Sequence, residues 1–291
     1  MKKININTHK MSKRDVRRER MGERECVEEK TPLKVKPHFV LIHGISGGSW
    51  CWYKLKSMMY DSGYMVTCID LKGAGIDPSD PNTILSFDEY NKPLLDFLSS
   101  LPNNQKVILV GHSAGGLSVT QATHKFPDKI SLAIYVAATM LKNGFLTEQD
   151  VKDGAPDLSE YGDAYDLQFG LGSNQPPTSA TVKKELQRKV IYPMAPPEDY
   201  ILASMLLRPG PINALQNARF PEGNPSIEKV PRVYIKTMYD KVVKPEQQDN
   251  MIAKWPPSHV YVLESDHSPN FSSPFALFGI LVKVATSIGC M

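Results

Sequence analysis

Short apolar runs alternate along the chain with segments in which apolar residues recur at helical spacing. The runs are rich in β-branched residues, as is typical of strands buried on both faces of a parallel sheet. They cover residues 38–42, 64–70, 106–110, 131–137, 232–239 and 259–264. Helices are predicted over residues 87–100, 116–126 and 274–288. This order predicts an α/β fold, a mostly parallel sheet with helices on both faces, whose ligands bind at the carboxyl edge of the strands.

Residues 140–225 interrupt this alternation. They contain two proline pairs, two helical stretches at 182–190 and 199–207, and no clear strand pattern. We therefore expect an inserted helical cap that closes over the carboxyl edge of the sheet and excludes water. Large apolar side chains of the cap are candidates for the wall of a pocket, and we expect about a third of them to touch a ligand. They are Met140, Phe145, Leu146, Tyr165, Phe169, Met205, Leu206, Leu207 and Phe220.

The charge of the chain is divided near residue 36. Residues 1–36 carry twelve Lys or Arg and six Asp or Glu, whereas the remaining residues carry 22 and 25. The first segment has few apolar residues and no sustained periodicity, so it predicts a disordered basic extension. Its interleaved glutamates weaken the positive field, which favours a solvated tail over an arm that binds nucleic acid or membrane. Residues 37–291 are then expected to form one domain with the cap inserted.

Cysteine spacing and hydropathy narrow the class of protein further. The four cysteines are scattered without C-x-x-C spacing, which argues against a zinc site or a disulfide framework. No apolar run reaches the roughly eighteen residues that a membrane-spanning helix needs, and the beginning of the chain lacks the apolar centre of a signal peptide. We expect free thiols and a cytoplasmic protein that binds neither membrane nor nucleic acid.

Candidate chemistry begins at residues 107–118, which read VILVGHSAGGLS. The strand pattern stops at a Gly-x-Ser-x-Gly turn, and a helical pattern follows as far as the residue before Pro127. A strand, this turn and a helix predict a nucleophile elbow, in which Ser113 takes a strained conformation and Gly111 and Gly115 let the flanking chains approach. The alternative is an ordinary glycine-rich turn with a solvated serine.

A serine hydroxyl needs a general base within hydrogen-bond reach and a third group that orients the base. In this architecture the order along the chain is Ser, acid, His, each just after a strand at the same sheet edge. His267 follows the last predicted strand and Asp240 follows the strand before it, so they are the predicted base and acid. Asp266 is a rival acid, but neighbouring side chains rarely face each other as a triad requires. The alternative for His267 is a purely structural histidine.

Attack on a carbonyl creates an oxyanion, which preorganised N–H donors stabilise by roughly 3 kcal/mol each. One predicted donor is the N–H of Ala114, directly after the nucleophile, and the second is the N–H of Ile45 in the loop after the first strand. Gly44 lets this loop approach closely, and His43 is expected to shape the loop. The predicted substrate-binding residues are Gly44, His112, Met140, Phe145, Leu146 and Met205.

Several motifs together resemble the plant methylesterase group of α/β-hydrolases over about residues 37–291. They are HGISGGSWCWYKL at 43–55, SFDEY at 86–90, GHSAGG at 111–116, LLRPG at 206–210, and Asp240 with Asp266-His267. The group includes methyl salicylate, methyl jasmonate and methyl indole-acetate esterases and polyneuridine aldehyde esterase. The resemblance implies an α/β-hydrolase fold and hydrolysis of a small-molecule methyl ester through an acyl-enzyme. It implies neither a metal nor an organic cofactor.

The same group contains hydroxynitrile lyases, which cleave cyanohydrins with the same triad. Those enzymes have threonine where this chain has Gly44, glutamate where it has His112, and lysine where it has Ser268. Without the positive charge of that lysine, a leaving cyanide would not be stabilised. The comparison therefore favours an esterase over a lyase.

The segment ESDHSPNFSSP at 264–274 departs from the Asp-His-Met pattern of the salicylate-type members. It looks more like the branch associated with methyl indole-3-acetate, which makes that ester the favoured substrate ahead of methyl salicylate and methyl jasmonate. A function of another class is a hormone-binding receptor that keeps the triad with little turnover. We expect the chain to be a monomer or a homodimer.

Overall fold

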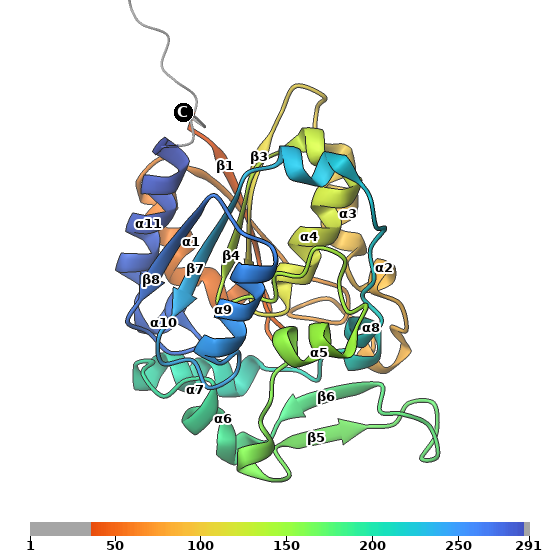
Figure 1. The fold of residues 1–291 in the computed structure, drawn as a ribbon. Helices are drawn as coiled ribbons and strands as arrows, with labels where there is room; N and C mark the ends of the chain where they lie inside the picture. Colours follow the sequence, from red (N-terminus) through yellow and green to blue (C-terminus); the bar gives the residue numbers. More distant parts are fainter. Residues whose placement is uncertain (1–35, 288–291) are drawn as a thin grey trace, which may run out of the picture. The chain divides into compact units, whose positions relative to one another are not determined.

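A six-stranded parallel sheet organises residues 36–287, the part of the chain that this computed structural model describes (Figure 1). Its strands are β1 (His38–Ile42), β2 (Met65–Ile69), β3 (Val107–His112), β4 (Ile130–Val136), β7 (Arg232–Thr237) and β8 (His259–Leu263). They lie in the order β2-β1-β3-β4-β7-β8 and pair in parallel throughout, so the predicted sheet is confirmed. The order reverses between β1 and β3, and ligands of such sheets bind at the carboxyl ends of the strands beside this reversal.

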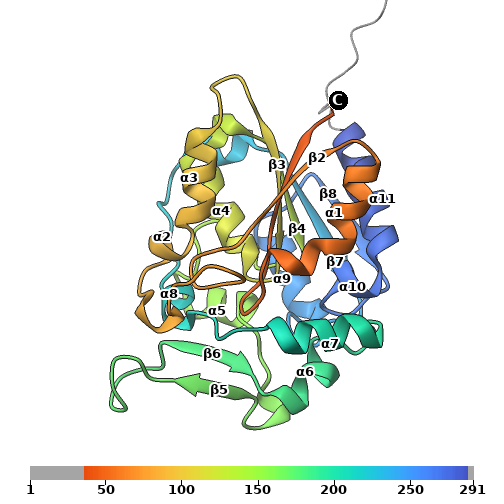
Figure 2. The same cartoon turned by 180° about the vertical axis from the view of Figure 1, so that it is seen from behind.

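Central strands are apolar along their whole length because helices cover both faces of the sheet. Alternate residues of a strand point to opposite faces. In β3, Val107 and Leu109 belong to one hydrophobic cluster, and Ile108 and Val110 belong to the other. The first cluster includes side chains of α2 (Phe87–Tyr90), α3 (Lys92–Ser100), α4 (Gly115–Lys125) and α9 (Pro245–Lys254). The second includes side chains of α1 (Tyr53–Asp61), α10 (Pro269–Ser272) and α11 (Pro274–Ser287). Figures 1 and 2 show these two helical layers from opposite sides.

The predicted helix over residues 87–100 is divided into α2 and α3 at Asn91. Pro93 lies in the first turn of α3, where its missing N–H leaves no helical hydrogen bond unmade. The buried Asn91 amide donates to the Ser118 carbonyl over 3.2 Å and to the Gln121 side chain over 2.8 Å. Asn91, the residue at this helix break, therefore connects the segment to α4, the helix that follows β3.

The cap between β4 and β7 contains helices and a short antiparallel sheet. Its elements are α5 (Glu148–Gly154), β5 (Tyr165–Gln168), β6 (Ser179–Val182), α6 (Lys184–Val190), α7 (Pro197–Leu206) and α8 (Ile212–Gln216). The helices α6 and α7 match the two predicted helical stretches, whereas the β5–β6 pair was not predicted. Each strand has only four residues and β5 is largely exposed, so neither contains an apolar run that periodicity detects. Figure 1 shows this segment beyond the carboxyl ends of the sheet strands.

Five 3₁₀ helices complete the secondary structure of the described residues: η2 (Ser49–Trp52), η3 (Pro81–Thr83), η4 (Pro127–Lys129), η5 (Ser159–Tyr161) and η6 (Pro225–Lys229). The predicted basic extension, residues 1–36, lies outside the described residues apart from Lys36. Between residues 36 and 287, no helix is both long and apolar enough to cross a membrane.

Substitution of Gly115 by alanine tests the close approach of α4 to the end of β1. An added Cβ would lie 2.5 Å from the His43 carbonyl oxygen and 2.8 Å from that of Ile42, so the backbone must move. We expect Gly115→Ala to lower the free energy of unfolding by roughly 1–3 kcal/mol, measured by urea denaturation. Gly279→Ala is the control, because this exposed glycine of α11 has no atom within 4 Å of an added Cβ. Alanine there should stabilise by about 0.5–1 kcal/mol, and equal effects of the two substitutions would refute the packing argument.

Candidate active site

The turn between β3 and α4 holds Ser113 in a strained backbone conformation. Its φ is +54°, in the left-handed region that residues other than glycine rarely adopt. A Cβ on Gly111 would lie 2.6 Å from the Gly115 carbonyl oxygen, so the turn needs glycine at position 111. The Ser113 N–H donates to the Val136 carbonyl over 3.2 Å, and the Ser113 carbonyl accepts from the Thr139 N–H over 3.0 Å. This is the geometry of the elbow predicted from the sequence.

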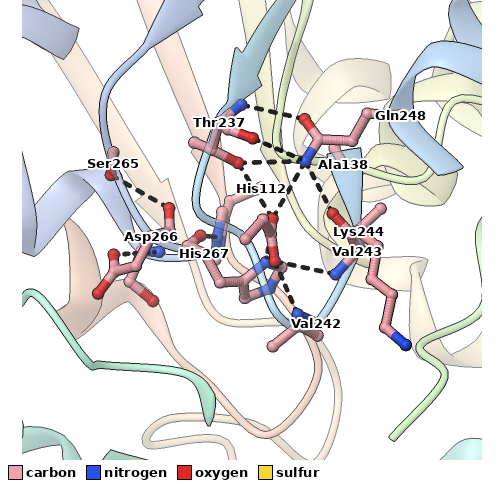
Figure 3. Close-up of polar contacts among 12 residues, drawn as sticks. His112, Ala138, Thr237, Val242, Val243, Lys244, Gln248, Ser265, Asp266 and His267 are labelled. Atoms are coloured by element: carbon pink, nitrogen blue, oxygen red, sulfur yellow. Dashed lines mark hydrogen bonds and ion pairs between the residues drawn. The ribbon is translucent and has the colours of Figure 1, made fainter. Parts of the chain in front are cut away.

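His267, which Figure 3 labels, follows β8 and lies beside Asp240, which follows β7. His267 Nδ1 and Asp240 Oδ2 are 2.9 Å apart, and both side chains are buried. Asp240 Oδ1 accepts the N–H groups of Val242 and Val243 over 2.8 and 2.9 Å, and Thr237 Oγ1 donates to Oδ2 over 3.1 Å. Both oxygens of the Asp240 carboxylate therefore accept hydrogen bonds. The proton between the two residues is therefore on His267 Nδ1, which leaves Nε2 as an acceptor.

Asp266 points to a different set of partners. Its Oδ1 accepts the Ser268 N–H over 3.0 Å and the Ser272 hydroxyl over 2.8 Å, and its Oδ2 accepts the Met194 N–H over 2.8 Å. Figure 3 shows this carboxylate directed away from the His267 ring. Asp266 thus connects the start of α10 to the cap, and Asp240 is the carboxylate that contacts His267.

His112 holds the loop that carries His267. Its Nε2–H donates to the His267 carbonyl over 2.6 Å, and the centroids of the two rings are 4.8 Å apart. Burial, together with the charge that His267 can carry, lowers the pKa of His112 to about 3. His112 is therefore neutral across the physiological range. His112 also lines the cavity beside Ser113, and its hydrogen bond orients the His267 backbone.

Two free N–H groups lie near Ser113, that of Ile45 in the loop after β1 and that of Ala114 in the turn between β3 and α4. In the described structure, neither Ile45 N–H nor Ala114 N–H has a protein acceptor. His43 shapes this loop: its Nε2 accepts the Leu71 N–H over 3.1 Å, so its Nδ1–H donates to the Gly44 carbonyl, 2.7 Å away. Burial lowers the pKa of His43, which keeps the ring neutral. The two free N–H groups are available to a developing oxyanion.

Two cavities meet at Ser113. The first has a volume of about 710 Å³ including its open mouth, and its lining includes His267 and Tyr192. The second has a volume of about 1160 Å³ on the same basis. The residues shared by both linings are Ile45, Ser113, Pro156 and Tyr165. The Ser113 hydroxyl has no hydrogen-bond partner among residues 36–287, but it lines the same cavity as His267, and such contacts often tighten only when substrate binds.

Three predicted substrate-binding residues line these cavities and three do not. Gly44 and His112 line the first cavity, and Phe145 lines the second. The other three correct the prediction, since neither cavity includes them: Met140, Leu146 and Met205. Met140 is fully buried in the core, and its N–H contacts the sulfur of Met251 at 3.2 Å. Leu146 and Met205 face solvent, with 40% and 74% of their surface exposed.

The wider set of apolar cap residues divides in the same way. Tyr165 lines both cavities and Leu207 lines the first. Phe220 packs against Phe87 in the core, while Phe169 and Leu206 are exposed. Residues of the first cavity that the sequence analysis did not assign to substrate include Cys51, Tyr192, Asn270 and Phe271. Cys51 belongs to the motif HGISGGSWCWYKL, and membership of this motif is the sequence signal that could have identified Cys51 as a cavity residue.

Within residues 36–287, no group of three or more His, Cys, Asp or Glu is placed to hold a metal ion. Cys51 and Cys68 are free thiols, and burial raises the pKa of each, to about 11 for Cys68. Neither thiol is therefore poised to be a thiolate nucleophile at neutral pH.

Comparison with known proteins identifies the family of this chain. A family model described as the alpha/beta hydrolase fold matches residues 37–274. Methylesterase 17 of Arabidopsis thaliana is 58% identical over 271 residues, which cover 92% of this chain and 98% of that protein. The chain belongs to the plant methylesterase family of α/β-hydrolases.

A second named relative and a solved structure are also similar to this methylesterase-family chain. Pheophorbidase of Raphanus sativus is 47% identical and aligns over 86% of this chain and 94% of that protein. The crystal structure of methylesterase MES16 from Arabidopsis superposes with a TM-score of 0.77 at 45% identity, covering 86% of this chain and 99% of that one. The predicted family and fold are therefore confirmed.

Acid should destabilise this methylesterase-family protein through its buried neutral histidines. In the unfolded chain His112 titrates near its ordinary value of 6.5, whereas in the folded protein its pKa is about 3. Between these values the unfolded state binds more protons, so stability falls as the pH falls below about 6.5, by up to roughly 1.4 kcal/mol per pH unit for this group.

Urea denaturation at pH 7, 6 and 5 measures this dependence. We expect His112→Gln to have a shallower pH dependence than the wild type, because glutamine does not titrate. His259→Gln replaces an exposed histidine of β8 and should keep the wild-type dependence. Identical slopes for all three proteins would show that His112 does not contribute to the acid sensitivity.

Proposed function

We propose that this protein is a serine carboxylesterase that hydrolyses methyl esters of small, plant hormone-like carboxylic acids. Methyl indole-3-acetate is the favoured substrate, followed by methyl salicylate and methyl jasmonate. The observation that carries the proposal is the 2.9 Å contact between His267 and Asp240 in a cavity that the strained Ser113 also lines. Membership of the plant methylesterase family supports the same conclusion.

In the proposed mechanism, Ser113 Oγ attacks the ester carbonyl while His267 Nε2 takes the hydroxyl proton. The N–H groups of Ile45 and Ala114 stabilise the oxyanion. The protonated His267 then gives its proton to the departing methoxy oxygen, and methanol leaves an acyl-enzyme. Water, activated by His267 in the same way, releases the free acid and restores Ser113. Asp240 keeps the His267 proton on Nδ1 throughout, so that Nε2 always faces the reaction. No cofactor takes part in the proposed reaction.

The two cavities suit the two parts of a methyl ester. The general acid must reach the leaving oxygen, and His267 lines only the first cavity, so we place the methoxy group there. The acyl part of the ester then extends into the larger second cavity. Its lining is mainly apolar, with Leu117, Phe145, Leu167, Ile212 and Leu215 as its largest aliphatic and aromatic side chains apart from the shared residues. Such a surface favours an aromatic or alicyclic acid over a charged one.

The alternative functions predict different behaviour at the same site. A cyanohydrin lyase would need a cation beside His267, where this chain has the neutral, buried Ser268. A receptor would bind the free acid with little turnover. The contact between Asp240 and His267, the unpaired N–H groups of Ile45 and Ala114, and the strained Ser113 favour catalysis, because a site that only binds needs none of these features.

The proposal is tested by initial-rate hydrolysis of methyl indole-3-acetate, methyl salicylate and methyl jasmonate. We expect at least one ester to be turned over at millimolar or lower concentration, and Ser113→Ala to lower kcat by roughly 10³-fold or more because the nucleophile is lost. Equal inactivity of both proteins, together with binding of a free acid, would replace the esterase with the receptor. The distribution of rates among the three esters tests the preference for the indole acid.

Substitution of the two neighbouring aspartates separates the triad acid from its rival. Asp240→Asn should lower kcat by roughly 10³–10⁴-fold, since the amide no longer favours the productive tautomer of His267. Asp266→Asn should lower kcat by less than about tenfold while reducing the melting temperature, because its partners lie in α10 and the cap. The reverse order of effects on kcat would assign the triad acid to Asp266.

A further inference from the structure

The LLRPG motif at the end of α7 contacts the loop that carries the Ile45 N–H. Arg208 donates its backbone N–H to the Ser46 carbonyl over 3.0 Å. Two residues later, Gly210 lies so close to the loop that an added Cβ would be 2.2 Å from Ile45 Cγ1 and 3.0 Å from Ser46 N. The outer side of the loop is therefore packed against the cap, while His43 holds its inner side.

The Arg208 guanidinium reaches a second segment that is bonded to the same loop. Its Nη1 donates to the carbonyls of Gly75 and Asp77 over 3.0 and 2.6 Å, and its Nη2 donates to the Ser79 carbonyl over 3.3 Å. The Gly75 N–H in turn donates to the Gly47 carbonyl over 3.3 Å. One arginine thus connects the cap, the loop after β2 and the loop after β1. A lysine ammonium has no planar fork with which to reproduce this set of bonds.

The loop needs these contacts because its backbone is strained. Ser46 has φ of +65°, a conformation that persists in a residue other than glycine only when the surroundings enforce it. The cap segment that faces Ser46 is itself fixed, since Gly210 and Ala180 exchange backbone hydrogen bonds of 2.8 and 3.0 Å. The Ser46 hydroxyl also lies 3.4 Å from the Ala180 carbonyl. The strained residue directly follows Ile45, so relaxation of Ser46 would shift Ile45 and with it the Gly44–Ile45 peptide, which carries the Ile45 N–H.

We propose that Arg208 and Gly210 are positioning residues, which fix the direction of the Ile45 N–H in the oxyanion hole. The proposal rests on the esterase function proposed above. An oxyanion donor lowers the barrier only when it is in place before charge develops, so a small displacement of the loop weakens catalysis without removing the triad. The cap thereby contributes to transition-state stabilisation as well as to the pocket wall.

Three variants with two matched controls test this role. Arg208→Ala removes the guanidinium bonds, Arg208→Lys keeps the charge, and Gly210→Ala pushes a Cβ against Ile45. Arg219→Ala, at an exposed cap arginine, controls for loss of a positive charge. Gly279→Ala controls for the added methyl group. Each variant is measured for kcat and KM, for its melting temperature, and for inhibition by an aryl trifluoromethyl ketone, which forms a tetrahedral oxyanion on the serine, and by the free acid.

Arg208→Ala and Gly210→Ala should lower kcat by roughly ten- to a hundredfold, less than the complete loss of a donor. The Ki of the ketone should rise by a similar factor, whereas KM and the Ki of the free acid should change by less than about threefold. Arg208→Lys should be intermediate, and both controls should keep the wild-type values of kcat, KM and Ki. An equal rise in the Ki of the ketone and of the free acid, or wild-type kcat in both variants, would overturn the positioning role. These residues would then only attach the cap to the core.

Amide hydrogen exchange tests the same contacts without any assay of activity. In Arg208→Ala and Gly210→Ala, exchange in a peptide covering residues 43–48 should accelerate, while exchange in residues 111–116 should not change. Unchanged exchange at 43–48 would overturn the proposal even if the enzyme were impaired. If wild type hydrolyses no ester, the proposed function fails, and the exchange experiment still decides whether the cap holds the loop.

Discussion

The close approach of backbones around Ser113 is the constraint on which the site depends. Four glycines lie where a Cβ would collide with a neighbouring chain: Gly44 against Ser113, Gly111 against Gly115, Gly115 against the end of β1, and Gly116 against Thr139. The carboxyl ends of β1, β3 and β4 can therefore converge on one turn. The strain at Ser113 persists because these contacts leave no room for the turn to relax. Backbone packing therefore holds the Ser113 hydroxyl and the free N–H groups of Ile45 and Ala114 in place before any substrate binds.

The hydrogen-bond donors around each carboxylate, more than nearness to His267 along the chain, separate the roles of Asp240 and Asp266. Asp266 is the sequence neighbour of His267, yet its oxygens are occupied by Ser268, Ser272 and the cap N–H of Met194. Asp240 is 27 positions away, and its strand ends where two backbone N–H groups can fix one oxygen while the other meets the imidazole. The parallel sheet makes this possible because the ends of neighbouring strands lie at one edge whatever their separation along the chain.

The sheet and the candidate triad could be predicted because their signals are local. Buried parallel strands are continuous apolar runs, and in this architecture each catalytic group follows a strand in a fixed order. The cap was less predictable. Its helix α7 is apolar on several sides, and Ile201 and Met205 are exposed while Ala203 is buried, so periodicity alone could not identify the face that turns inward. The β5–β6 pair is held by bonds to partners that only the folded chain brings together, such as Asn82 with Gln168 and Ser179.

The position of the cap in the chain has a consequence for how such enzymes can diversify. The cap is one continuous insertion between β4 and β7, so mutations can alter the wall of the second cavity without touching the strands that precede Ser113, Asp240 and His267. That freedom has limits where the cap is joined to the core, at Gln168, Ser179, Met194, Arg208 and Gly210. An engineer who exchanges caps between relatives to transfer substrate preference should therefore keep these junctions and vary the residues between them.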